Sequence, residues 1–130
     1  MIHNIYIIKN GILLYSKNLN VEEEESSDID DLLARFLGTI QYLYSSCSNS
    51  VIESIECNKV KLHFYQDPIN PSILFVFKTD VKLKEKKLRS TIFKIASSFL
   101  KKYSRNLEYF LGKVYTFQSF NESIVNMNIQ

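Results

Sequence analysis

The chain has 130 residues, of which 45% are hydrophobic and 23% are charged, and its formal net charge is +2. This length suits one domain, the apolar share is enough for a hydrophobic core, and the composition argues against a disordered chain. The mild positive charge does not by itself indicate a nucleic-acid-binding protein. The sequence therefore predicts a single domain over residues 1–130.

The first predicted elements are two short apolar runs on either side of the dipeptide Asn10-Gly11. Residues 2–9 are rich in β-branched side chains, which favour strands, and residues 11–17 begin with a similar apolar run. Asparagine and glycine tolerate the positive φ angles that a tight turn between two paired strands requires. The pattern predicts a β-hairpin that opens an antiparallel sheet.

A helix is predicted over about residues 28–46, after an acidic stretch that we expect to be a solvated loop. Ser27 is placed as its N-cap, and acidic residues fill its first turn, where they favour the positive end of the helix dipole. Its apolar side chains recur every three or four residues and form one stripe, as in a helix that buries one face. These residues are Ile29, Leu32, Leu33, Phe36, Leu37, Ile40, Leu43 and Tyr44.

Three further strands are expected before the second long helix. Residues 51–57 carry two glutamates, as an edge strand would, and residues 60–65 alternate apolar with polar side chains, as a half-buried strand does. Residues 72–79 form an almost continuous apolar run, which predicts a central strand buried on both faces. We expect this strand and the one at residues 2–9 to be neighbours at the centre of the sheet.

Two helices are expected to complete the domain. Residues 82–110 carry an apolar stripe opposite a lysine-rich face, and Gly112 is placed as the residue that stops this helix. The stretch from Phe117 to Met127 has the spacing of a short amphipathic helix. The order ββαβββαα predicts an α+β fold with a five-stranded antiparallel sheet, one helix on one face and two on the other.

This pattern resembles a longin-like domain, the module found in longin SNAREs, adaptor small subunits, transport-complex subunits and small-GTPase regulators. The resemblance covers nearly the whole chain, and its carriers are IYIIKNGILLYSK, DIDDLLARFLGTIQYLY, VKLHFY, ILFVFKTD and the ending IASSFLKKY with FQSF. It implies a longin/profilin-like sheet. It also implies a non-catalytic module that forms a homodimer or heterodimer and binds a Ras-like small GTPase or another trafficking component.

Other members of the same superfamily, and other function classes, are alternatives. No heptad repeat or apolar anchor follows the last expected helix, so we expect a longin protein without a SNARE motif. The related roadblock fold carries a helix before its first strand, whereas the first strand is expected here at residue 2. The alternative function is a structural small subunit of an adaptor or tethering complex, followed by a lipid-binding module or an enzyme with an unrecognised site.

The sequence offers no catalytic, cofactor-binding or metal-binding residues. The histidines His3 and His63 lack partners at metal or triad spacing, and neither a phosphate-binding glycine loop nor a GxSxG motif is present. Cys47 and Cys57 form no CxxC pair, and we expect them to be reduced thiols of a cytoplasmic protein. Neither a transmembrane segment nor a nucleic-acid partner is expected, because no sufficiently long apolar run and no nucleic-acid-binding motif occur.

The main protein-contact surface is predicted on the outer face of the helix at residues 28–46 and on the edge strand at residues 11–17. A glycine inside a helix costs about 1 kcal/mol relative to alanine, and a pair of small residues lets a second backbone approach closely. Arginine and tyrosine are favoured at interfaces. The residues proposed for this surface are Asp31, Ala34, Arg35, Gly38, Tyr42, Leu13 and Tyr15.

A cluster of lysines lies at the beginning of the helix at residues 82–110. A solvated helix face is the simplest interpretation of this cluster. The alternative is a peripheral contact with anionic lipid, because cations near a membrane surface are attracted to its negative headgroups. The residues of this cluster are Lys82, Lys84, Lys86 and Lys87.

Overall fold

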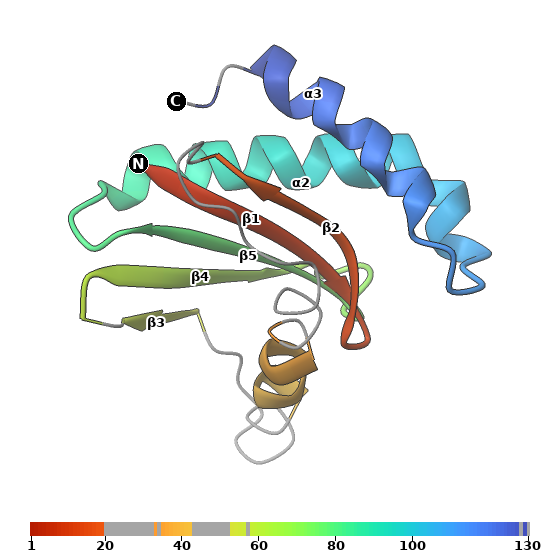
Figure 1. Ribbon diagram of the computed structural model, residues 1–130, viewed down its shortest axis with the longest axis horizontal. Coiled ribbons are helices and arrows are strands. Elements are labelled where there is room, and N and C mark those ends of the chain that lie inside the picture. The colour runs from red at the N-terminus through yellow and green to blue at the C-terminus, as the bar shows by residue number, and fades with distance from the viewer. Residues whose placement is uncertain (20–32, 34, 43–52, 57, 128, 130) are drawn as a thin grey trace.

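The computed structural model describes residues 1–19, 33, 35–42, 53–56, 58–127 and 129. They form an α+β fold (Figure 1). Its elements are β1 (Ile2–Lys9), β2 (Ile12–Asn18), β3 (Ser54–Glu56), β4 (Val60–Gln66), β5 (Ile73–Asp80), α2 (Glu85–Glu108), the 3-10 helix η1 (Tyr115–Ser119) and α3 (Phe120–Met127). Residues 35–42 are also helical, and both ends of the helix expected at residues 28–46 lie outside the described residues.

The strands form one antiparallel sheet in the order β2-β1-β5-β4-β3. The strands β1 and β5 are central neighbours, and β2 and β3 are the edges of the described sheet, as the sequence predicted. The central strands are apolar on both faces, so burying them there removes the most apolar surface from water. The apolar side chains of these two strands that have no exposed surface are Ile5, Ile7, Ile73, Phe75, Val76 and Phe77.

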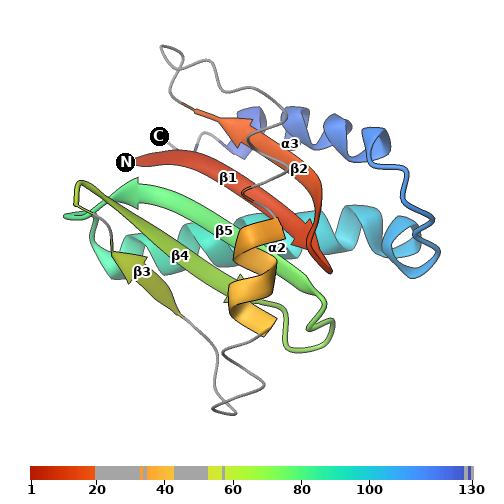
Figure 2. The same ribbon diagram turned by 60° about the horizontal axis from the view of Figure 1, so that its bottom comes forward.

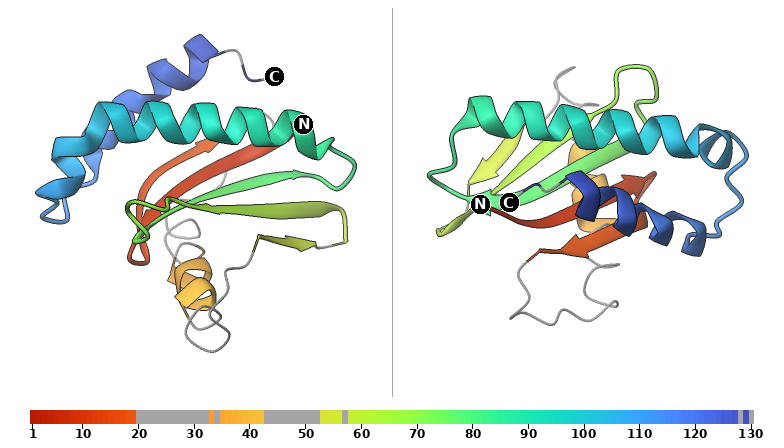
Figure 3. Two further views of the ribbon diagram at one scale, coloured as in Figure 1. Left: turned by 180° about the vertical axis from the view of Figure 1, so that it is seen from behind. Right: turned by 90° about the horizontal axis from the view of Figure 1, so that it is seen from above.

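Hydrophobic clusters lie on both faces of the sheet. On one face, α2, η1 and α3 cover β1, β2 and β5, and Figure 3 shows α2 and α3 together on this side. On the other face, the helical segment 35–42 lies across the strands (Figure 2), and Leu37 packs among Tyr6, Phe64 and Val76. The predicted division, with one helix on one face and two on the other, is therefore confirmed for the described residues.

The strand β2 contains a bulge that changes which side chains it buries. Its register with β1 shifts by one residue, so that Ile7 pairs with Tyr15 while Ile8 pairs with Leu13. Leu14 is the additional residue. As a result, Leu14 and Tyr15 both join the cluster under α2 and α3, whereas Leu13 packs against the cluster on the opposite face.

Two phenylalanines expected in the apolar stripes of their helices are exposed instead. Phe36 is 61% exposed and Phe93 is 65% exposed. Phe36 directly precedes the buried Leu37, and Phe93 directly follows the buried Ile92. Successive residues of a helix are about 100° apart around its axis, so each phenylalanine lies on a flank. Among the described residues, no helix has both the length and the apolar character needed to cross a membrane.

Candidate interaction site

A hollow of about 380 Å³ lies where the helical segment 35–42 meets the β1–β2 turn and the turn between β4 and β5. Amide and hydroxyl side chains predominate in its polar lining, and none of the described residues that line it carries a charge. Such a lining suits the neutral hydrogen-bonding groups of a peptide chain better than an ionised ligand. We call this feature the turn hollow.

The floor of the turn hollow is held by hydrogen bonds between separate segments. Gln41, 6% exposed, donates from Nε2 to Oε1 of Gln66 at 3.4 Å, and Gln66 donates from its own amide to the carbonyl of Pro71. The backbone N–H of Asn10 donates to the carbonyl of Ser72 at 3.1 Å. These contacts join the helical segment and both turns, so the walls of the hollow are fixed relative to one another.

Gly38 brings the helical segment into direct backbone contact with the β1–β2 turn. Asn10 and Gly11 have φ angles of 49° and 79°, as the tight hairpin predicted from the sequence requires. A Cβ atom on Gly38 would lie 3.0 Å from the Cα of Gly11. Gly38 was expected on the outer face, where it would admit a second chain. Gly38 instead contacts the β1–β2 hairpin of its own chain. With Leu37 facing the core, Gly38 faces the turn.

We expect Gly38→Val to lower the free energy of unfolding by about 1–3 kcal/mol, because the new side chain would meet the backbone of Gly11, which cannot rotate away. Thr39→Val is the matched control, since Thr39 is exposed, and it should change stability by less than about 0.5 kcal/mol. Chemical denaturation measures both changes. Equal stability of Gly38→Val and the wild type would contradict the close approach.

The helical segment that lines the turn hollow also carries exposed side chains. Tyr42, which lines the hollow, is 71% exposed, and Arg35 is also exposed. Phe36 adds a second exposed aromatic ring to the same segment. Exposed aromatic and arginine side chains beside a preformed hollow are typical of the anchors of a protein interface. Two of the predicted contact residues, Asp31 and Ala34, lie outside the described residues.

Tyr15 lies inside the domain rather than on the contact surface for which it was proposed. It is 4% exposed, its hydroxyl donates to Oδ1 of Asn121 at 2.5 Å, and its ring meets the edge of Phe120 at 5.4 Å between centroids. Burial raises the pKa of its phenol above the usual range. The bulge at Leu14 turns Tyr15 toward α3, and Leu13 is likewise partly buried. This part of the predicted surface is therefore core.

The lysine cluster at the beginning of α2 is exposed, as expected for a solvated helix face. It contains Lys82, Lys84, Lys86 and Lys87. Glu85 lies among them, 3.7 Å from the ammonium group of Lys61 and 3.9 Å from the guanidinium group of Arg89. Exposed pairs at such distances contribute little to stability.

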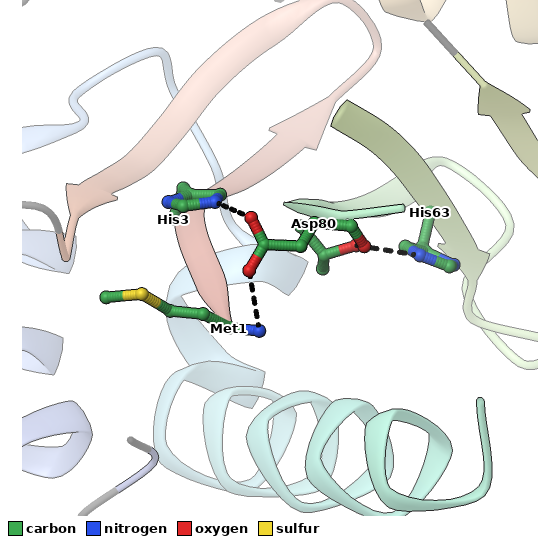
Figure 4. A network of polar contacts seen from close by, with 5 residues as sticks. Met1, His3, His63 and Asp80 are labelled. Carbon is green, nitrogen blue, oxygen red and sulfur yellow. Dashed lines mark hydrogen bonds and ion pairs between the residues drawn. The ribbon is translucent and has the colours of Figure 1, made fainter. Parts of the chain in front are cut away.

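A polar network joins β1, β5 and β4 at the end of β5 (Figure 4). Asp80 accepts a hydrogen bond from Nε2 of His3 at 2.7 Å through one carboxylate oxygen, and its other oxygen lies 3.2 Å from the terminal ammonium group of Met1. His63 donates from Nε2 to Oγ1 of Thr79 at 3.1 Å, and the Thr79 hydroxyl donates to the Asp80 carbonyl. The network connects three strands, which gives it a structural role.

Two side chains of this network have lowered pKa values. Hydrogen bonding from His3 and the terminal ammonium group lowers the pKa of the Asp80 carboxyl, and burial, with a smaller effect of Lys61, lowers the pKa of His63. Within the described ranges, no three histidine, cysteine, aspartate or glutamate residues are placed to hold a metal ion. The two histidines bond to different partners on adjacent residues and do not converge on a common point.

We expect the wild type to be more stable than Asp80→Asn near neutral pH, with a difference that disappears in acid. The folded pKa of Asp80 is lowered, so its contribution is present above the unfolded pKa of about 4 and is lost as the pH falls through the folded pKa. Thermal unfolding from about pH 7 to pH 2 measures this difference. Glu108→Gln, at an exposed position, is the control. A difference that persists unchanged into strong acid would contradict this role of Asp80.

The turn hollow itself was not predicted, because its polar lining comes from distant parts of the chain. Gln41 was expected only as a helical residue, and Gln66 and Pro71 lie between the strands expected at residues 60–65 and 72–79. The signal available in the sequence was a glutamine one turn beyond Leu37, on the side of the helix expected to be buried. A buried amide requires a hydrogen-bond partner, and that requirement could have indicated a second polar segment nearby.

Comparison of the chain with protein-family models and with curated proteins found no match in either case. The fold and the geometry of the site are therefore the observations from which its function is inferred.

Proposed function

We propose that this chain is a non-catalytic, longin-like protein-interaction module of the cytoplasm that dimerises and binds a Ras-like small GTPase or another trafficking component. The observation that carries the proposal is the sheet order β2-β1-β5-β4-β3, with the helical segment 35–42 on one face and α2 and α3 on the other. This is the arrangement that the resemblance in sequence implies, and that resemblance supplies the class of partner.

The contact surface of this module is the rim of the turn hollow with the outer face of the helical segment. Tyr42 and Arg35 are its anchors, because Tyr42 is exposed at the hollow and Arg35 is exposed on the same helical segment. The strand β2 lies at the neighbouring edge of the described sheet and offers a site at which a second chain can add a strand. A two-fold dimer would use the same patch on both protomers.

Titration with purified Ras-like GTPases, each loaded with GDP or with a GTP analogue, tests the proposal. Saturable binding that depends on the bound nucleotide is the expected result, since the switch regions of a GTPase differ between the two states. Binding to adaptor or tethering subunits with no response to any GTPase in either state would instead favour the alternative, a structural small subunit. The same titration with Tyr42→Asp locates the contact.

A further inference from the structure

The turn between α2 and η1 exposes an unusual number of apolar side chains. The helix α2 ends at Glu108, and Gly112, with a φ of 92°, redirects the chain before η1 begins at Tyr115. Over residues 109–115, Leu111 is 91% exposed, Tyr115 is 72% exposed and Tyr109 is 71% exposed. Apolar side chains that remain in water at this density mark a contact surface.

The base of this turn is anchored in the core, so the exposed side chains are held in place. Phe110 packs against the cluster under α2 and α3, with its ring centroid 6.2 Å from that of the fully buried Phe117. Val114 packs against the same cluster. The backbone N–H of Tyr109 donates to the carbonyl of Arg105 at 3.1 Å, which continues the helical hydrogen bonding into the turn. The outward direction of Leu111 is thus set by its buried neighbours.

The turn lies at one end of the molecule, where it can contact a flat surface before the rest of the domain does. It projects beyond the ends of the strands at one end of the long axis of the molecule (Figures 1 and 3). The turn between β4 and β5 approaches the same end, because Ile69 and Glu108 line one hollow beside the end of α2. Ile69 is itself 87% exposed. This end of the domain therefore carries exposed apolar side chains from two turns.

Cations surround the base of the same turn. Arg105 and Lys113 line a hollow of about 310 Å³ together with Asn106 and Thr116 and with apolar side chains of the turn itself, Leu111 among them. Residues 101–115 contain four basic residues and one acidic residue, a net charge of +3. A guanidinium and an ammonium group with neighbouring amide and hydroxyl donors form the chemistry that binds a phosphate.

We propose that residues 109–115 are a membrane-docking loop for bilayers that contain anionic phospholipid. Leu111 enters the acyl boundary, Tyr109 and Tyr115 lie at the level of the headgroups, and Arg105 and Lys113 hold a lipid phosphate in the hollow at the base. From the bilayer interior outward, a membrane interface favours aliphatic side chains, then amphipathic aromatic rings, then cations, and this loop carries all three kinds. This docking goes beyond the proposed protein contact and uses a different end of the domain.

An anionic lipid surface is the partner that the exposed apolar side chains and the positive charge of this turn favour. A bilayer with anionic lipid supplies both an apolar layer for Leu111 and phosphates for Arg105 and Lys113, which lie beside it around one hollow. Near the exposed lysines at the beginning of α2, Leu88 and Ile92 are buried and Phe93 is the large apolar side chain that remains exposed, whereas residues 109–115 expose three. Charge alone, without an inserted side chain, gives weaker attachment that salt removes.

A single tryptophan reports insertion directly, because the chain contains no tryptophan of its own. Leu111→Trp is expected to shift its emission to the blue on vesicles of phosphatidylcholine with about 30% phosphatidylserine, and to be quenched by brominated lipid in them. Phosphatidylcholine alone should give little shift. Phe93→Trp, at an exposed site on α2, is the matched control and should stay unshifted. An unshifted Leu111→Trp, or equal shifts at both sites, would overturn the proposal.

Sedimentation with the same anionic vesicles separates the contributions of the two kinds of side chain. Leu111→Glu should weaken partitioning about ten-fold or more, and Lys113→Glu by about 5- to 30-fold. Lys87→Glu, the same charge change at the other end of α2, should weaken it less than about three-fold. The assignment would be overturned if Lys113→Glu and Lys87→Glu weakened vesicle binding equally, or if Leu111→Glu bound as tightly as the wild type. It would also be overturned if the wild-type domain did not sediment with any of the vesicles. Thermal unfolding of each variant checks that its fold is intact.

Discussion

Replacing Phe75 with alanine is expected to lower the free energy of unfolding by about 3–5 kcal/mol. Phe75 has no exposed surface and lies on β5, between β1 and β4. Its ring meets the edge of Phe99 at 5.9 Å between centroids and lies 6.0 Å from the ring of Tyr65. Because β5 is paired on both sides, its backbone cannot move to fill the cavity, and the lost contacts are not recovered.

Urea denaturation measures this loss, with an unchanged m-value as evidence that both variants unfold from the same compact state. Phe93→Ala is the matched control, since the same side chain is removed from a position that is 65% exposed. It should change stability by less than about 1 kcal/mol. A loss under about 1 kcal/mol for Phe75→Ala would contradict the central position of β5 in the core.

Tyr42→Asp is expected to weaken self-association or GTPase binding by about 2 kcal/mol or more, which is about 30-fold. The ring of Tyr42 is 71% exposed at the rim of the turn hollow, so the change removes an anchor and places a charge in the contact without disturbing the core. Phe93→Asp, on the opposite face of the sheet, provides the matched control. Calorimetric titration measures the affinity of each variant, and equal affinities would remove Tyr42 from the contact.

The central strands and the hairpin were predictable because each is encoded within a few adjacent residues. A continuous apolar run such as the one around Phe75 is stable only where both faces of a strand are covered. Asn10-Gly11 provides the two positive φ angles of the turn without strain. Once these positions are set, apolar stripes on the helices determine which sides of the sheet they cover.

The surface positions could not be read in the same way, because they depend on how elements pair and rotate. A register shift in β2 decides that Tyr15 is core, and no local pattern in the sequence marks the bulge at Leu14. The rotation of the helical segment about its own axis, set by Leu37, decides that Gly38 meets the hairpin. In the same way, the exposure of Leu111 depends on the residue at which α2 ends.

Molar mass measured by light scattering, for the chain alone and after mixing with a Ras-like GTPase loaded with a GTP analogue, tests the proposed function most directly. We expect a mass above the 15.2 kDa of one chain for the chain alone, or in the mixture a species with the summed mass of the chain and the GTPase. We also expect that Tyr42→Asp lowers this mass and that Phe93→Asp does not. A mass of 15.2 kDa for the chain alone together with two separate, unassociated species in the mixture, or an identical response of both variants, would contradict the proposed function.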